Sequence, residues 1–370
     1  SNKRGAAPMS KPSDSYTFPR TGHIVRNRSV LAAMTNKQSH ADGTLSEEEI
    51  NWLVKRAEGG FGIITTAATH VVSEGQGWDG EMGVWGDHQL PGLTRMADEI
   101  RGHGSISLAQ IFHGGMRCPQ RLTSVQPVSA SVNPTNDSEN GKTRELEEPE
   151  IEALIDAFAM AAVRCEKAGF DGVEIHGAHG YLICQFLGTE TNRRNDRWGG
   201  PLENRARFLL TIIERIRQLT RESFLVGVRI SPEYNQIGVV LEDSLDLVDL
   251  LAESEIDFLH ISCWDCFTSP THSDDPRMVT EILAERLDNR LPLISCGAAW
   301  STKHAQQIME QGADLVGVAR AAIGHSDWAS HLDNPDYDPQ RPPFTSEYLL
   351  SQALSEKFID YMRNWKDFVE

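Results

Sequence analysis

The sequence has few cysteines, fewer basic than acidic residues, and no long apolar run. Six cysteines in 370 residues are too sparse for a disulfide framework, which favours a reducing compartment. Lys and Arg number 35 against 53 for Asp and Glu, and the net charge of -18 opposes binding to nucleic acid or anionic membranes. No apolar run approaches the roughly 18 residues of a membrane span, and the first residues, SNKRGAAPMS, lack the apolar core of a signal peptide. We therefore predict a cytoplasmic protein with no nucleic-acid or membrane partner.

A dinucleotide fingerprint is missing as well. An open, doubly wound sheet would be expected to carry G-x-G-x-x-G after its first strand, and no such motif is found there. The chain instead repeats the order amphipathic helix, short turn, apolar strand. The strands are predicted within 29–33, 61–66, 104–112, 173–176, 223–231, 256–262, 291–297 and 312–320. Eight apolar strands alternating with helices favour a parallel sheet closed as a (β/α)8 TIM barrel, with the open sheet as its competitor.

The length fits two average domains or one large barrel, and no shift in composition marks a second domain. We expect a disordered arm at 1–20 and a single barrel domain at 21–370. The stretch 114–149 is rich in Ser, Asn and Pro and far longer than an ordinary loop, so it is predicted to form a lid over the barrel mouth. One final amphipathic helix is expected from the apolar residues Leu349, Leu350, Leu354, Phe358 and Met362.

Polar residues stand at several predicted strand ends, where barrels of this type gather their catalytic groups. His176, His179 and Tyr181 follow one strand within six residues, which suggests a site that polarises a substrate. Arg229 lies inside the apolar run LVGVRIS, where a charge must be paired, and a structural salt bridge would also explain it.

The last two strands end in glycine-containing turns. Gly297 and Gly317, followed by Arg320, suit a monophosphate, because glycine lets backbone N–H groups approach the oxygens and a guanidinium adds a bidentate charge. The two glycines are equally compatible with tight turns that bind nothing. A non-catalytic barrel that binds a phosphorylated ligand is therefore one alternative.

Metal binding is the main alternative for the histidines. A metal-dependent barrel lyase or hydrolase would use His176 and His179 as ligands, but a third ligand is needed, and Glu174 is expected to point away from His176. Cys263 and Cys266 form a single C-x-x-C, which could be a redox pair or half a metal site, yet no second such pair exists. We predict no metal site.

The stretch from Asp171 to Arg205 carries the most specific motif. Its H-G-A-H-G-Y core, followed by N-R-R-N-D-R-W-G-G and L-E-N-R, resembles the Old Yellow Enzyme family of FMN-dependent NADH:flavin oxidoreductases and ene-reductases. Weaker similarity runs from about Asn27 to the last helix. The larger iron–sulfur relatives carry a dense cysteine cluster and further domains, so this chain resembles the single-domain members. One departure is Met116, within H-G-G-M-R, which occupies a position where relatives often have arginine.

The resemblance implies bound FMN, reduced by NADH or NADPH, and hydride transfer to the β-carbon of an activated alkene. Tyr181 would donate the proton, while His176 and His179 would hydrogen-bond the substrate carbonyl. Small-molecule enones, quinones or nitro compounds would be the oxidants, and a homo-oligomer is compatible with the family. The implied FMN contacts are Ala33, Met34, Thr35, Ala68, Gln110, Arg229, Gly297, Ala298, Gly317 and Arg320.

Overall fold

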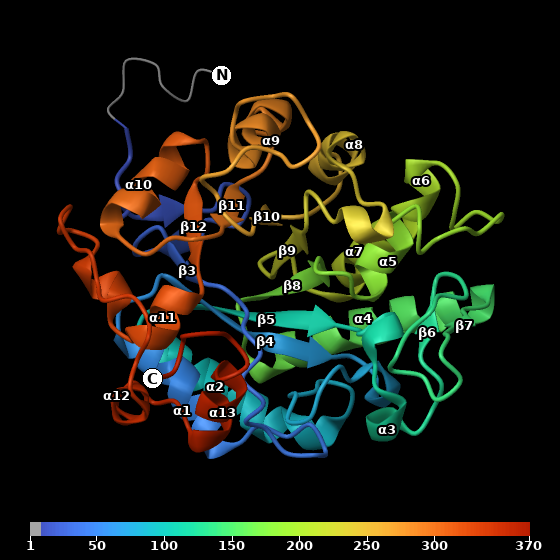
Figure 1. Cartoon of the computed structure of the whole chain (residues 1–370), viewed down its shortest axis with the longest axis horizontal. Coiled ribbons are helices and arrows are strands. Elements are labelled where there is room, and N and C mark those ends of the chain that lie inside the picture. Colours follow the sequence, from blue (N-terminus) through green and yellow to red (C-terminus); the bar gives the residue numbers. More distant parts are fainter. Residues whose placement is uncertain (1–8) are drawn as a thin grey trace.

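A closed barrel of eight parallel strands forms the centre of the computed structural model, which describes residues 9–370 (Figure 1). Around the barrel the strands are β3 (Ser29–Leu31), β4 (Ile63–His70), β5 (Ile106–Phe112), β8 (Gly172–Gly177), β9 (Leu225–Ile230), β10 (Phe258–Ser262), β11 (Leu293–Cys296) and β12 (Leu315–Val318). β12 pairs in parallel with β3 and closes the ring. All eight correspond to the predicted apolar runs, so the barrel is confirmed and the open sheet is excluded.

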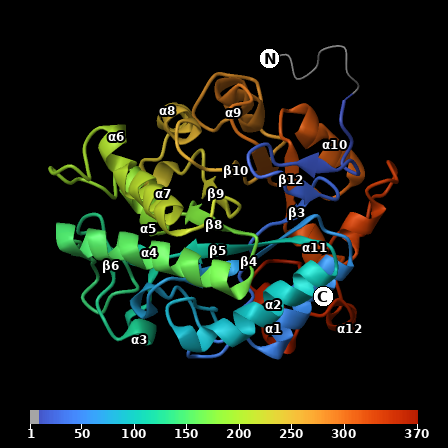
Figure 2. The ribbon, with the colours of Figure 1, turned by 180° about the vertical axis from the view of Figure 1, so that it is seen from behind.

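Helices surround the barrel because each buries its apolar side against the strands. The longer ones are α1 (Glu47–Glu58), α2 (Leu90–Gly102), α4 (Glu148–Ala168), α7 (Arg207–Leu219), α8 (Leu241–Ala252), α9 (Val279–Leu287) and α10 (Thr302–Glu310). The shorter ones are η2 (Ser73–Gly75), η3 (Asp87–Gln89), α5 (Leu182–Leu187), α6 (Leu202–Arg205), η5 (Asn235–Ile237), α11 (Arg320–Gly324) and η6 (Trp328–His331). From behind, α2, α4 and α7 cross the outside of the barrel (Figure 2). Within 9–370, no helix has the length and apolar character to cross a bilayer.

The amino-terminal end of the barrel is closed by an apolar plug. Strands β1 (Tyr16–Thr17) and β2 (Ile24–Val25) pair antiparallel, and Phe18 between them is fully buried against the ring of Phe258, 6.1 Å away between centroids. Phe18, expected within a disordered arm at 1–20, is therefore part of the core, and Tyr16 packs against it. Of that expected arm, residues 1–8 lie outside the described residues.

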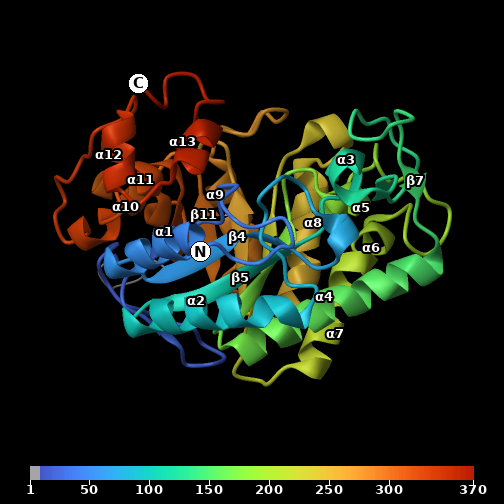
Figure 3. The same ribbon diagram turned by 90° about the horizontal axis from the view of Figure 1, so that it is seen from below.

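The predicted lid segment folds between β5 and α4 as a chain of short elements. These are η4 (Gly115–Arg117), α3 (Gln120–Thr123), β6 (Val128–Ser129) and β7 (Arg144–Glu145), the last two forming a small sheet. In Figure 3, α3 and β7 lie along the same edge of the molecule as the C-terminal helix α13 (Glu356–Met362). The lid follows β5 directly, so the lid lies at the end of the barrel that is formed by the carboxyl ends of the strands.

The C-terminal segment forms two helices, so the expected single amphipathic helix is wrong. Helix α12 (Ser346–Ser351) ends before Ala353, which adopts a left-handed conformation with φ 66°, and the Ser355 hydroxyl then caps α13 by accepting from the Phe358 N–H. Because the chain turns between the two helices, α13 reaches the strand ends.

Candidate active site

The barrel brings the predicted site residues to one end, since the carboxyl ends of its parallel strands meet there. The residues are placed as Ala33, Met34 and Thr35 after β3, Ala68 in β4, Gln110 in β5, His176 in β8, His179 and Tyr181 after β8, Arg229 in β9, Gly297 and Ala298 after β11, Gly317 in β12, and Arg320 at the start of α11. The strand register sets Ala68 opposite Gln110 and His176 opposite Arg229.

His176, His179 and Tyr181 form one aromatic wall. The ring of His176 lies 5.1 Å from the rings of both His179 and Tyr181, measured between centroids. This proximity depends on a tight turn, in which His179 (φ 63°) and Gly180 (φ 75°) both adopt left-handed backbone conformations. Phe112 supports the wall from behind, 4.6 Å from Tyr181.

His176 is a neutral donor. The Ala178 N–H donates to His176 Nδ1 at 3.2 Å, and burial lowers the pKa of His176 to about 3. The imidazole is therefore uncharged at pH 7, and its proton must be on Nε2. Nε2 forms no hydrogen bond with any residue of the described chain, so it can donate to a ligand oxygen.

His179 is also neutral, because burial and the charge of Arg229 hold its pKa well below the usual range. His179 Nε2 lies 2.7 Å from the Ser262 hydroxyl, which also accepts from Arg229 Nη2 at 3.3 Å. A hydroxyl that accepts from Arg229 can still either donate to or accept from His179 Nε2, so this contact is compatible with the imidazole proton on Nδ1.

The charge of Arg229 is balanced by Glu174. Glu174 is fully buried, accepts from Gln110 Nε2 and lies 2.8 Å from His260 Nδ1. Burial alone would raise the pKa of Glu174, but His260, Arg229 and Gln110 together lower it to about 2, so the carboxylate is ionised. The expectation that Glu174 points away from His176 is wrong, because residues two apart on a strand share a face.

A metal centre is not supported. Within residues 9–370 no group of three or more His, Cys, Asp or Glu side chains could hold a metal ion. The third ligand that His176 and His179 would need is therefore lacking, since Glu174 is engaged by Gln110 and His260. The metal-dependent lyase or hydrolase loses its structural basis.

The two glycine turns have packing reasons of their own. A Cβ on Gly297 (φ 156°) would lie 2.3 Å from the Cys263 carbonyl oxygen, and one on Gly317 would lie 2.7 Å from Cys296 Cβ. Glycine is therefore required at both positions even without a phosphate. Arg320 is exposed beside these turns and forms no hydrogen bond or ion pair with the described residues.

FMN fits the donors at this end of the barrel. Arg229 is 4% exposed, yet its Nε is a buried donor with no partner in the described structure. A buried unpaired donor is costly, about 1–3 kcal/mol, unless a ligand accepts from it. A flavin ring with its oxygens and nitrogens would supply an acceptor at Arg229, and the phosphate would supply one at Arg320.

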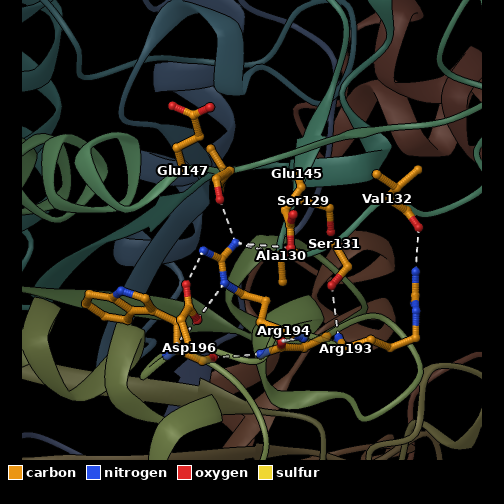
Figure 4. A network of polar contacts seen from close by, with 12 residues as sticks. Ser129, Ala130, Ser131, Val132, Glu145, Glu147, Arg193, Arg194 and Asp196 are labelled. Carbon is orange, nitrogen blue, oxygen red and sulfur yellow. Dashed lines mark hydrogen bonds and ion pairs between the residues drawn. The ribbon is translucent and has the colours of Figure 1, made fainter.

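The N-R-R-N-D-R-W-G-G motif anchors the lid, a role that sequence reasoning missed (Figure 4). Arg194 is buried and donates to the carbonyl oxygens of Ala130 and Leu146 while pairing with Asp196 at 2.7 Å. Arg193 donates to the Val132 carbonyl on the same stretch of lid. The repeated arginines were the only indication of this role in the sequence. Their partners are backbone carbonyls, which every residue has, so the partners could not be recognised from residue types.

Other site residues were also missed. Buried Gln185 accepts from the Met116 N–H at 3.1 Å and donates to the Gly180 carbonyl at 2.8 Å, which joins the lid to the His179–Tyr181 turn. Tyr361 of α13 lies near Thr35, which partly opposes the rise that burial causes in the pKa of Tyr361.

The fold and the polar strand ends define the class of protein, a (β/α)8-barrel enzyme with its site at the carboxyl ends of the strands. The model of the NADH:flavin oxidoreductase / NADH oxidase family matches residues 21–338, and the chain belongs to this family. A probable NADH-dependent flavin oxidoreductase of Bacillus subtilis is 38% identical over 85% of each chain. The NADH:acrylate oxidoreductase of Vibrio harveyi is 33% identical over 89% of this chain, which spans 34% of that protein.

Comparison with solved structures supports the same family. The Old Yellow Enzyme homologue of Zymomonas mobilis superposes with a TM-score of 0.78 at 26% identity, over 95% of this chain and 99% of that one. The predicted resemblance is thereby confirmed. The protein is an FMN-dependent NAD(P)H oxidoreductase.

Proposed function

We propose that the protein reduces the C=C bond of a small activated alkene, such as an enone. The observation that carries this is the pair of protic groups on one wall, the His176 Nε2–H and the Tyr181 hydroxyl, with their rings 5.1 Å apart. Neither group is hydrogen-bonded to any residue in 9–370. One can hold an oxygen while the other delivers a proton to carbon.

FMN, when bound, supplies the hydride, and NADH or NADPH supplies its electrons. The residues proposed to hold its ring are Ala33, Met34, Thr35, Ala68, Gln110 and Arg229. The residues proposed to hold its phosphate are Gly297, Ala298, Gly317 and Arg320. The unpartnered Nε of Arg229 and the unpaired guanidinium of Arg320 support this division.

The two histidines are proposed to stabilise negative charge on the substrate oxygen. Both are neutral at pH 7, so each donates one hydrogen bond without giving up its proton. The Ala178 N–H fixes the tautomer of His176, and the contact of His179 Nε2 with Ser262 is compatible with a proton on Nδ1 of His179. The oxygen is thus polarised from two directions before charge develops.

Tyr181 is proposed to protonate the substrate carbon. Burial raises its pKa to about 12, although the nearby Arg117 opposes the rise, so the phenol is protonated throughout the physiological range. A phenol of this pKa is a weak acid in water but a competent donor to a carbanion-like carbon held within reach.

The Tyr181→Phe variant tests the proton donor. In anaerobic stopped-flow experiments we expect reoxidation of the flavin by cyclohexenone to slow about 100-fold or more, with its reduction by NADPH or NADH changed less than about threefold. Tyr337→Phe, whose ring stacks on His331 instead of lying at the strand ends, is the matched control. Equal slowing of both half-reactions would remove Tyr181 from this role.

We further propose that the reduced flavin is oxidised by small enones, quinones or nitro compounds. We also propose a cytoplasmic location, which is supported by the free thiols of Cys118, Cys165, Cys184, Cys263, Cys266 and Cys296, since such thiols persist in a reducing compartment.

A further inference from the structure

Arg117 places a cation directly against the catalytic wall. Its guanidinium carbon lies 4.3 Å from the centroid of the Tyr181 ring, and its Nη1 donates to the His179 carbonyl oxygen at 2.8 Å. It is the last residue of η4, at the start of the lid, and its side chain is exposed.

Much of this guanidinium is available to a ligand. Nε and Nη2 of Arg117 form no hydrogen bond with residues 9–370, and none of the carboxylates in that range pairs with it. Asp137 is near enough for its charge to act on Arg117, but the two form no ion pair or hydrogen bond. Arg121, four residues along the chain, instead pairs with Asp79 at 3.0 Å. Arg117 is therefore an exposed arginine with free N–H groups beside the proposed reacting groups.

A second cation lies near the same groups. Lys37 has a left-handed backbone (φ 58°), and its Nζ lies 5.2 Å from the centroid of the Tyr361 ring. The charge of Arg117 also acts on Tyr361, where it partly opposes the rise in pKa that burial causes. Two cations, Arg117 and Lys37, therefore lie against Tyr181 and Tyr361, two tyrosines near enough for their charges to interact.

We propose that Arg117 binds a carboxylate carried by the alkene substrate, an inference that rests on the proposed alkene reduction. His176 and His179 are neutral and can hold an oxygen, but they cannot offset a full negative charge. Arg117 can, because its free N–H groups can grip a carboxylate in a bidentate manner. Since Tyr181 must reach the alkene, an anionic group on that alkene lies within reach of the guanidinium stacked on Tyr181. The substrate class is then an activated alkene that bears a carboxylate.

The test compares two probes that share the same enone and differ in charge, 4-oxopent-2-enoate and its methyl ester. The holoenzyme is reduced anaerobically, and reoxidation is followed with each probe. In Arg117→Gln we expect the ratio of kcat/KM for the acid over the ester to fall roughly tenfold, the size of one partly exposed charged hydrogen bond. Any effect transmitted through Tyr181 slows both probes and cancels in the ratio.

Two further variants sharpen the result. Arg117→Lys should keep part of the preference for the acid, because it keeps the charge. Arg121→Gln removes the same charge from the same segment, away from the wall, and should leave the ratio unchanged. A ratio that is the same in Arg117→Gln and the unmodified enzyme overturns the proposal.

The diphosphate of the nicotinamide is a second oxyanion that Arg117 could bind. Flavin reduction by NADH is therefore measured on the same variants as a function of NADH concentration. The dissociation constant of NADH is expected to stay unchanged. If this constant rises while the acid-to-ester ratio does not move, Arg117 serves the dinucleotide and the proposal is overturned.

Calorimetric binding of levulinate, the saturated analogue of the acid probe, separates this inference from the proposed function. Weaker binding of levulinate to Arg117→Gln, with methyl levulinate unaffected, supports the anion site even if neither alkene is reduced. No binding of levulinate to the unmodified holoenzyme overturns it.

Discussion

Replacing Arg194 with alanine is expected to release the lid and leave the barrel folded. The Arg194 side chain is 5% exposed and donates to the Leu146 and Ala130 carbonyls at 2.6 and 2.9 Å, besides pairing with Asp196 (Figure 4). A buried carbonyl that loses its donor costs about 1–3 kcal/mol, so two of them cost about 2–5 kcal/mol after partial recovery by water. Asp196 adds little, because it is 42% exposed and regains solvent.

Hydrogen exchange followed by mass spectrometry measures the loss of stability within the lid itself. The amides of Arg144 and Leu146 bond to carbonyls of the facing segment, at Pro127 and Ser129, and should exchange at least roughly 30-fold faster in Arg194→Ala. Amides of the central barrel strands should keep their protection. Arg197→Ala is the matched control, since Arg197 is 55% exposed and pairs only with surface carboxylates. Equal exchange in the two variants, or loss of protection throughout the barrel, would refute the reasoning.

Two further predictions concern pH and the cofactor. Burial lowers the pKa of His113 and His176 to about 3, so between about pH 6.5 and 3 the unfolded chain binds protons that the folded chain does not. The two histidines should therefore lower the free energy of unfolding as pH falls from 7 to 5, while buried Glu49, whose pKa burial raises to about 7, acts in the opposite direction. In urea titrations the stability of His113→Gln should shift upward at pH 5 relative to pH 7, compared with the unmodified protein, and an identical pH dependence contradicts the assignment. Gly297→Ala sets a Cβ 2.3 Å from the Cys263 carbonyl and should lower the FMN retained on purification, whereas Gly102→Ala, with no atom within 4 Å of the added Cβ, should not; equal retention would show that the turn does not hold the phosphate.

The barrel could be predicted from the sequence because each of its strands and helices is recognisable from the pattern of residues within its own short stretch. Strands such as Leu225–Ile230 are short and apolar on both faces, and each is followed by a helix with one apolar side. Strand ends then follow from strand positions, so His176, Arg229 and Gly317 could be placed at one end of the molecule before any contact was known.

The partners of those residues could not be predicted, because they come from distant strands. Glu174 and His260 are 86 positions apart and meet only when β8 and β10 flank β9 in the closed ring. Ser262 was likewise invisible as the partner of His179, since a serine at a strand end carries no distinguishing pattern. Tyr361 reaches Thr35 only because the chain turns at Ala353, where an unbroken helix was expected.

Gln185 connects the lid, which the N-R-R-N-D-R-W-G-G motif anchors, to the turn that carries Tyr181. Its Oε1 accepts from the Met116 N–H and from the Ser129 hydroxyl, both in the lid, while its Nε2 donates to the Gly180 carbonyl in the turn that carries Tyr181. Gly115 is obligatory beside it, because a Cβ there would lie 2.4 Å from Gln185 Oε1. If the lid loosens, this buried amide loses two of its partners and the Tyr181 turn loses a fixed support. The hydrogen bonds of Arg194 to the lid therefore also help to fix the turn that carries Tyr181, the residue proposed to donate the proton, and Gln185 is the side chain that connects the two.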